Sequence, residues 1–189
     1  MTRDRRHRIV TAGIVATAAI LASACAPGTK GDTVDSSLTA AEAFARVQAN
    51  LVEALSTLPP DTALSRTPQN PELATLTPGM TAPCTWDDTQ GDPPVSARVG
   101  YWVVGVPDGR TREYLQMIVD GLTAGGWHVG TDSRPTDQFV GLADPDRYGM
   151  AVQIAPGRPG SLSVEGTSPC FVGRPGSNDP TEPPVIEHP

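Results

Sequence analysis

The side chains of this sequence that could do chemistry are three histidines, three cysteines and two groups of neighbouring acids. Hydrolase-type catalysis needs a nucleophile beside a base. His7 and His188 lie near the two ends of the chain, so such a pair would depend on His128. The sequence has no Gly-x-Ser-x-Gly, Ser-x-x-Lys or His-Glu-x-x-His motif and no phosphate-cradling glycine loop. We therefore expect His128 to be a structural or exposed histidine, and we predict no catalytic residue.

The acids do not form an obvious pair for catalysis or metal binding. Asp87 and Asp88 are adjacent on a predicted strand, where successive side chains point to opposite faces, so they line one site only if they lie in a turn. The segment Asp144-Pro145-Asp146 separates two predicted strands and is typical of a solvated turn. Calcium binding by this loop and a glycosidase-type acid pair are less favoured alternatives. Two well-separated cysteines without clustered histidines do not form a zinc site. We predict no metal and no cofactor.

Cys25 follows a segment with the features of an export signal. Four arginines precede an apolar stretch, Ile9–Leu21, which is shorter than the about 20 residues that a membrane-spanning helix needs. The residues up to Cys25 resemble the lipobox of bacterial lipoproteins, in which a diacylglycerol is attached to the cysteine sulfur and the signal is cut just before it. Ala22 stands where leucine is usual in that motif. The resemblance implies a signal peptide over residues 1–24 and acyl chains on Cys25; the alternative is an ordinary signal peptide that leaves a free thiol.

The other two cysteines are expected to form a disulfide. In an exported chain an odd cysteine needs an explanation, and lipidation of Cys25 leaves Cys84 and Cys170 as one pair. Removal of residues 1–24 takes away four of the 14 basic residues and one of the 21 acidic residues, which leaves 10 and 20 and a formal charge of −10. Such a charge argues against nucleic-acid binding and against electrostatic adhesion to an anionic membrane. The lipid, on the extracytoplasmic face of the cell membrane, would be the anchor.

The elements that must position these residues follow from periodicity. A capping box at Thr39 and Glu42 and an apolar stripe predict a helix at about 39–57. A second stripe around Tyr114–Leu122 predicts another helix, capped by Asp108 or Thr111. Strands are predicted at residues 84–88, 95–106, 127–129, 138–143, 148–155 and 161–168. The sequence therefore predicts an α+β fold with one antiparallel sheet of about four to six strands, two helices packed on one face, and one disulfide.

The proline-rich parts of the chain divide the mature protein into segments. We expect a flexible tether over residues 25–37, an α+β domain over residues 38–172 and a disordered or polyproline-like tail over residues 173–189, with the option that the tail lies along the domain. Within the domain, residues 59–83 are expected to form an extended segment that wraps the surface. Val95–Val106 should alternate between the two faces of the sheet. We favour a Trp102 ring that is covered by the wrapping segment; the alternative is that the ring forms an apolar patch for a partner or a lipid.

The overall layout resembles the LppA-type lipoproteins of mycobacteria and related actinobacteria. The resemblance lies in the lipobox-like segment, the amphipathic first helix, the cysteine pair and the closing "EPPVIEHP". It implies location and fold type, and no functional residue can be carried over from it. The arginine-rich, lysine-poor composition, with one lysine and thirteen arginines, also favours an actinobacterial source.

The weak candidates for a binding surface are the three tryptophans. They are Trp86, Trp102 and Trp127, which are too few to define a stacking groove. We expect a non-enzymatic binding or accessory domain in the cell envelope, with a protein or a lipid as partner and no nucleic acid. The alternative is a carrier of small molecules or lipids with a cavity between helix and sheet. An enzyme that depends on His128 is the third and least favoured hypothesis.

Overall fold

The structure is a computed structural model that describes residues 34–84, 93–155, 157–158, 161–178 and 181–189. Over these residues the elements follow the order α1 (Ala40–Ser56), β1 (Ala63–Ser65), β2 (Met80–Pro83), β3 (Val95–Val104), α2 (Thr111–Ala124), β4 (His128–Asp132), β5 (Phe139–Ala143), β6 (Gly149–Ile154), β7 (Leu162–Thr167) and β8 (Val185–Glu187). The predicted signal peptide, the predicted acylation at Cys25 and all but the last residues of the predicted tether lie outside the described residues.

Helix α1 begins and packs as its sequence predicts. The Thr39 hydroxyl accepts a hydrogen bond from the backbone N–H of Glu42, and the Glu42 carboxylate accepts one from the backbone N–H of Thr39. This reciprocal capping box satisfies two N–H groups that would otherwise have no partner in the first turn. The apolar stripe is buried, with Val47, Leu51 and Leu55 each 0% exposed. The α1 prediction is confirmed.

Strand β3 is the centre of the antiparallel sheet. The strand order is β4-β5-β6-β7-β3-β1-β8, with β2 also paired to β3. β7 pairs with one edge of β3, while β1 and β2 pair with different parts of the other edge. The β3 side chains alternate as expected: Val95, Ala97, Val99, Tyr101 and Val103 are all buried. Half of the strand therefore belongs to the core and the other half faces the opposite side of the sheet.

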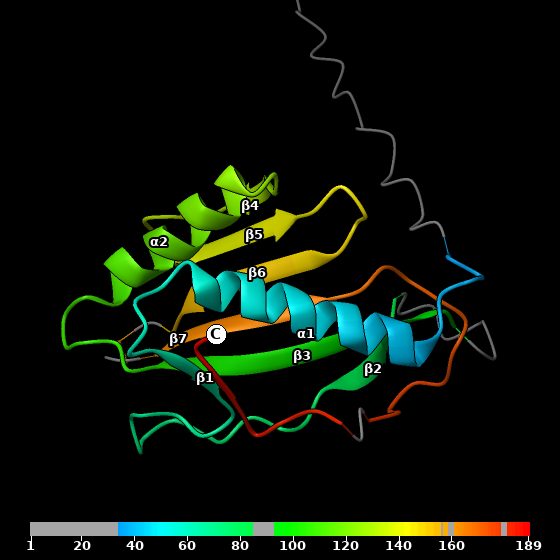
Figure 1. The fold of residues 1–189 in the computed structure, drawn as a ribbon, viewed down its shortest axis with the longest axis horizontal. Helices are drawn as coiled ribbons and strands as arrows, with labels where there is room; N and C mark the ends of the chain where they lie inside the picture. The colour runs from blue at the N-terminus through cyan, green and yellow to red at the C-terminus, as the bar shows by residue number, and fades with distance from the viewer. Residues whose placement is uncertain (1–33, 85–92, 156, 159–160, 179–180) are drawn as a thin grey trace, which may run out of the picture.

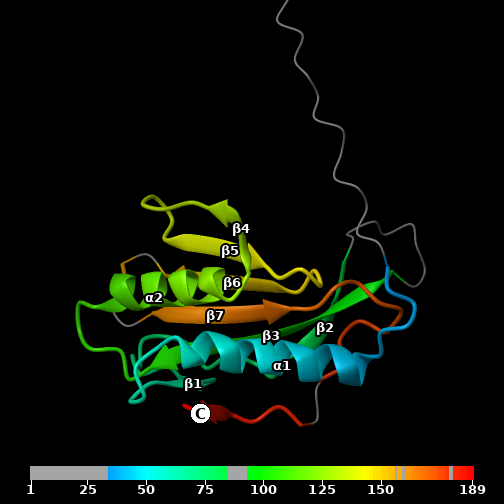
Figure 2. The same ribbon diagram turned by 45° about the horizontal axis from the view of Figure 1, so that its top comes forward.

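Both helices lie on the same side of the sheet, as predicted (Figures 1 and 2). α1 packs on β3 and β7, and α2 packs on β6. Between the helices and the sheet lies one contiguous cluster of buried residues from α1, α2 and the sheet strands, which includes Leu51, Tyr101, Ile118, Val152 and Val164. Burial of these apolar side chains is the main stabilising term of the fold.

The predicted cap of α2 is wrong. Arg110 occupies the N-cap position and makes no side-chain capping bond, so neither Asp108 nor Thr111 caps the helix. The start of the helix is instead held by local contacts. The backbone N–H of Arg110 donates to the carbonyl of Pro107 at 3.1 Å, and the Arg110 guanidinium pairs with Glu113 in the first turn.

The sheet has more strands than the four to six that we predicted. Over the described residues there are eight, and the three additional short strands are β1, β2 and β8. β1 and β2 lie within the proline-rich segment 59–83, which is therefore part of the sheet as well as a covering segment. Of the strand predicted at residues 84–88, only Cys84 is described, and it follows β2 directly. Strands of three or four residues carry too little periodicity to be recognised in a sequence.

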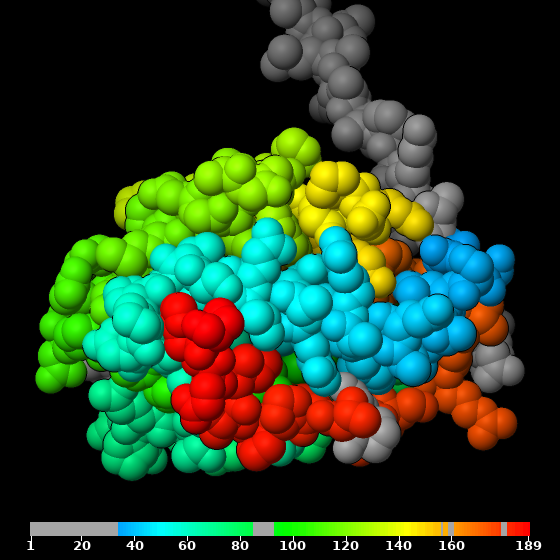
Figure 3. All heavy atoms as spheres, in the orientation of Figure 1, coloured from blue at the N-terminus to red at the C-terminus, as the bar shows by residue number. Residues whose placement is uncertain are grey.

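The tail was predicted to be disordered or polyproline-like, and its described last residues form a strand instead. β8 pairs with β1 and becomes the outermost strand at that edge of the sheet. The Tyr101 hydroxyl donates to the carbonyl of Pro183 at 2.7 Å, and Glu182 accepts a hydrogen bond from the backbone N–H of Gly79. The last described residues, 181–189, lie beside α1 and are drawn in red in Figure 3.

The predicted disulfide is present. Cys84 and Cys170 are bonded, with their Cα atoms 6.2 Å apart and a sequence separation of 86. Cys84 follows β2 and Cys170 follows β7 by three residues, so the bond joins the chain on either side of β3. Beside it, Val95 donates its backbone N–H to the carbonyl of Phe171, and Asp35 donates to the carbonyl of Cys170. The described N-terminal residues therefore enter the fold next to the disulfide.

Candidate functional site

The tryptophans do not form a common surface. Trp127 is 3% exposed and its indole N–H donates to the Glu53 carboxylate at 3.3 Å, so it belongs to the core and not to an exposed binding surface. Trp102 is half-buried on the side of the sheet away from the helices, and its indole N–H donates to the Ala74 carbonyl at 3.0 Å. Residues 66–79 thus cover this ring, as expected. Trp86 lies outside the described residues.

The histidines do not assemble a catalytic pair within the described part of the chain. His128 is exposed at the start of the edge strand β4, and its ring makes no hydrogen bond or ion pair with a described residue. His188 is in the tail, with its Nε2 2.9 Å from the carbonyl oxygen of Leu58. The acids Asp87 and Asp88 lie outside the described residues. No nucleophile lies beside either described histidine in any contact that the structure defines.

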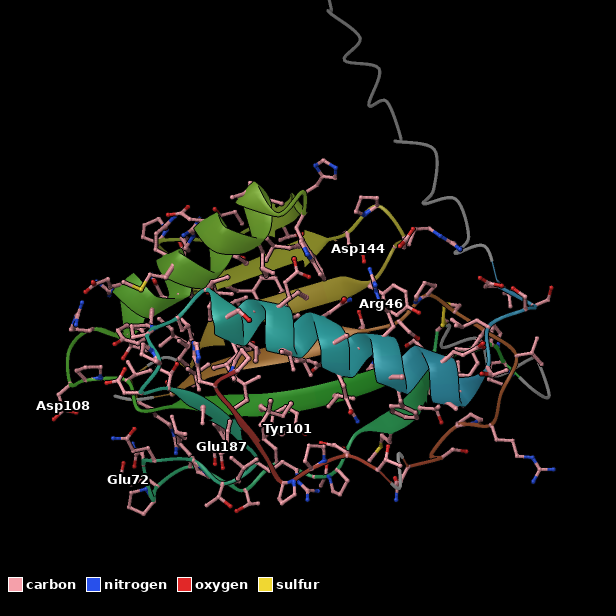
Figure 4. The ribbon with its side chains drawn as sticks, in the orientation of Figure 1. Arg46, Glu72, Tyr101, Asp108, Asp144 and Glu187 are labelled. Atoms are coloured by element: carbon pink, nitrogen blue, oxygen red, sulfur yellow. A yellow bond between two sulfur atoms is a disulfide. The ribbon has the colours of Figure 1, made fainter. Side chains whose placement is uncertain are left out.

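The turn after β5 contains one buried and one solvated acid. The side chain of Asp144 is 5% exposed and that of Asp146 is 73% exposed. The Asp144 carboxylate accepts a hydrogen bond from the backbone N–H of Tyr148 at 2.8 Å, and each carboxylate lies 3.7 Å from the Arg46 guanidinium. Figure 4 shows Arg46 and Asp144 side by side. The prediction of a solvated turn is correct for Asp146 and wrong for Asp144, because α1 brings Arg46 over the turn.

The Tyr148 ring completes this cluster. The Arg46 guanidinium carbon lies 5.9 Å from the centre of the Tyr148 ring, within the range of a cation–π contact. Burial raises the pKa of the Tyr148 hydroxyl, and Arg46 opposes that shift. Oδ1 of Asp144 is hydrogen-bonded to Tyr148, whereas its buried Oδ2 has only the 3.7 Å ion pair with Arg46 and no hydrogen-bond partner among the described residues. Within the described residues, no group of three or more His, Cys, Asp or Glu side chains could hold a metal ion.

The side of the sheet away from the helices is lined by small and polar residues. Directly paired residues of antiparallel strands point to the same face, and the register sets Arg98 opposite Thr167, Thr167 opposite Gly149, and Gly149 opposite Ala143. The next row runs through Gly100, Glu165, Ala151 and Gly141. We call these two rows the open face. Its side chains are exposed or half-buried, whereas the alternate residues of the same strands form the core.

A depression of about 250 Å³ lies at the end of the open face, beside the disulfide. It is lined by Cys84, Ser96, Arg98, Arg147, Gly149, Thr167, Ser168, Pro169 and Cys170, and we call it the arginine pocket. The residues come from β3, β6, β7 and the β5–β6 turn, together with the disulfide. No acidic side chain is among these lining residues, although the protein as a whole carries an excess of acids.

The polar groups of the arginine pocket differ in their existing partners. The Ser168 hydroxyl accepts from the backbone N–H of Ala97 at 2.9 Å and donates to the carbonyl of Pro169, so its hydrogen-bonding capacity is used by the fold. The hydroxyls of Ser96 and Thr167 and the guanidinium of Arg98 make no side-chain hydrogen bond or ion pair with a described residue. These groups are available to a polar ligand.

Arg147 has a left-handed backbone conformation. Its φ is 70°, one of two positive values for non-glycine residues in the described chain, the other being 50° at Gln138. Glycine is the default residue for this region, because a Cβ there costs about 1–2 kcal/mol. Arg147 also lines a second depression with Asp35, Leu38, Arg46, Pro145, Asp146, Tyr148 and Pro169. Arg147 therefore lies between the two depressions, at a position where glycine would strain the backbone less.

Sequence reasoning did not find the arginine pocket. Arg98 and Thr167 lie within strands that the sequence predicts, and Arg147 directly follows the predicted turn Asp144-Pro145-Asp146. No local pattern unites residues 98, 147 and 167, because their proximity depends on the β3–β7–β6 register. The one available signal was the alternation of β3, which places Arg98 opposite to the buried residues of that strand.

Comparison with known proteins gave no relative: no family model, no curated protein and no solved structure matches this chain. Among the helices of the described residues, none has the length and apolarity needed to cross a membrane.

Proposed function

We propose that this protein is a lipid-anchored, non-enzymatic binding domain of the bacterial cell envelope, and that it holds an anionic envelope component at the open face. The anchor is the acylated Cys25, on the outer side of the cytoplasmic membrane. The observation that carries the binding role is the arginine pocket, which is lined by two arginines, Arg98 and Arg147, and by Ser96 and Thr167 on a small-residue sheet face, with no acid among its lining residues. Charge complementarity therefore selects an anionic partner.

The opposite face of the sheet supports this choice over the carrier hypothesis. A carrier needs a cavity between helices and sheet, and the buried residues there pack as one contiguous cluster. A binding role also fits the isolation of His128 and the engagement of Asp144 by Arg46, which leave the described residues without a nucleophile–base pair. We accordingly expect no hydrolase activity from the purified chain across a broad substrate panel.

The anchor is tested on the full chain expressed in an actinobacterial host. Intact-mass measurement should find a diacylglycerol-modified N-terminus at Cys25 and no residues 1–24, and the chain should sediment with membranes. The Cys25→Ser variant should leave the membrane fraction. An unmodified N-terminus in the wild-type chain would contradict the anchoring half of the proposal.

The binding face is tested by photo-crosslinking in intact cells. A photoreactive residue at Gln153, an exposed position on the same side of the sheet as the open face, should form a defined adduct, and the same residue at Arg112, exposed on α2, should not. The Gln153 adduct should disappear when Arg98→Ala is added. Equal adducts at both positions, or an adduct that persists without Arg98, would contradict binding at the open face.

A further inference from the structure

The chemistry of the arginine pocket allows its ligand class to be named. We propose that the arginine pocket binds a phosphate group, carried either by an anionic phospholipid headgroup or by a small soluble phosphate. This inference rests on the proposed binding role of the open face and specifies its ligand. Arg98, Ser96 and Thr167 are the principal binding residues, and Arg147, whose charge also acts on Asp35, lines the same pocket from the β5–β6 turn.

The arrangement of donors favours a tetrahedral oxyanion over a carboxylate. Ser96 and Arg98 of β3 and Thr167 of β7 line the pocket from one face of the sheet, and Arg147 lines it from the β5–β6 turn. A guanidinium offers a planar pair of N–H donors that matches two phosphate oxygens. A phosphate has further oxygens for the two hydroxyls, whereas a carboxylate has only two oxygens in one plane. A depression of about 250 Å³ is large enough for such a group.

The backbone at Arg147 indicates that its side chain is needed. At a φ of 70°, glycine would stabilise the turn more than arginine does, because glycine has no Cβ. If the Arg147 side chain had no role, nothing would offset the backbone strain at this position. Strained backbone conformations concentrate at functional sites, where the side chain has a role that offsets the loss of stability.

Gly149 keeps the floor of the pocket free. It lies opposite Thr167 in the sheet and lines the pocket. A Cβ at this position would come within 2.5 Å of the Thr167 hydroxyl oxygen, so any side chain would displace that hydroxyl from its place in the pocket. Gly149 leaves space in the arginine pocket, and the side chain of Arg147 lines the same pocket.

Glu165 limits the strength of binding. It lines a neighbouring depression together with Arg98, on the same face of the sheet. A carboxylate near Arg98 lowers the local positive potential without entering the arginine pocket. The Glu165→Gln variant should therefore bind phosphate more tightly, which a merely structural role of Arg98 would not produce.

The first test is a titration of the full chain, purified in a neutral detergent, with inorganic phosphate, followed by amide chemical shifts. Shifts should cluster at residues 96–98, 147–149 and 167. Arg98→Ala and Arg147→Gly should each weaken binding at least tenfold, Glu165→Gln should tighten it two- to threefold, and Arg112→Ala, on α2, should leave it unchanged. Arg147→Gly should melt no lower than the wild-type protein, so its loss of binding would not reflect misfolding.

The second test distinguishes the sources of the phosphate. The Cys25→Ser chain is sedimented with vesicles of phosphatidylcholine alone or with one-third phosphatidylglycerol. Binding to the phosphatidylglycerol vesicles that is lost in Arg98→Ala assigns a lipid headgroup, and phosphate binding without vesicle binding assigns a soluble phosphate. Absence of phosphate binding, or binding that is unchanged in both arginine variants, would overturn the proposal. Phosphate binding without the Gln153 adduct would overturn the proposed function while the assignment of the pocket stands.

Discussion

The two faces of the central sheet are built from the same strands and serve opposite purposes. On the helix side, Leu51 and Tyr101 are fully buried, and Gly166 lies so close to α1 that a Cβ there would come within 2.8 Å of Val47. On the open face, the neighbouring strand positions carry Arg98, Glu165 and small residues, which are exposed or half-buried. The residues on the helix side form the core and stabilise the fold, whereas those on the open face contribute little to the core.

The difference shows where function can be placed in a small domain. Substitutions on the helix side remove packed volume, so selection there acts on stability. Residues of the open face contribute little to the core, and they can be chosen for a ligand. Arg147 is the clearest case, because its left-handed backbone conformation, at the border of the open face, lowers the stability of the protein.

The largest expected effect comes from the bond that joins the chain on either side of β3. Replacing Cys84 and Cys170 together by serine should lower the free energy of unfolding by about 4 kcal/mol, since the bond closes a long loop in the unfolded chain. Urea unfolding of the full chain in detergent measures this. Reduction of the wild-type protein should reproduce the value, and an unchanged urea midpoint would contradict it.

Two leucine substitutions, one on each side of the sheet, compare how much the two faces contribute to stability. Leu51→Ala on the helix side should cost about 3 kcal/mol of stability, because it leaves a cavity between α1 and Gly166. Leu76→Ala, at a half-buried position over Gly100 on the other side, should cost no more than about 1 kcal/mol. Equal costs in urea unfolding would show that both faces contribute equally to the core.

Arg147 provides the test of a stability cost at the open face. Arg147→Gly should raise the free energy of unfolding by about 1 kcal/mol, because glycine adopts a φ of 70° without a Cβ clash. Arg147→Ala is the matched control: it removes the guanidinium but keeps the Cβ, so it should not stabilise the protein. A gain in both variants would attribute the effect to charge and not to the backbone.

The smallest expected effect concerns the edge of the sheet. Arg134 donates hydrogen bonds to Asp132 and lowers the pKa of that carboxyl from 3.8 to about 2. A lowered pKa in the folded state stabilises the protein above the unfolded pKa and ceases to do so as the pH falls toward 2. Arg134→Ala should return the pKa of Asp132 toward 3.8, measured by carboxyl chemical shifts. Arg112→Ala should leave it at about 2; a low pKa without Arg134 would refute the assigned cause.

Much of the helix side could be predicted because its signals are local. The capping box at Thr39 and the alternation of Val95–Val103 specify a helix and a strand within a few residues. The short strands β1 and β8 could not be predicted, because they exist only through pairing between residues 63–65 and 185–187. Trp127 was misjudged for a similar reason, since its burial depends on Glu53 and α1, far away in the sequence.

The sequence by itself determined the principal helices and strands, the α+β class and the pairing of Cys84 with Cys170, because periodicity, capping and the cysteine count act locally or leave few alternatives. Only the tertiary structure decided that the tail completes the sheet and that Arg98, Arg147 and Thr167 share one pocket. The physical reason is register: which residues meet across an antiparallel sheet depends on the summed packing of all its strands and helices, and no short segment encodes it.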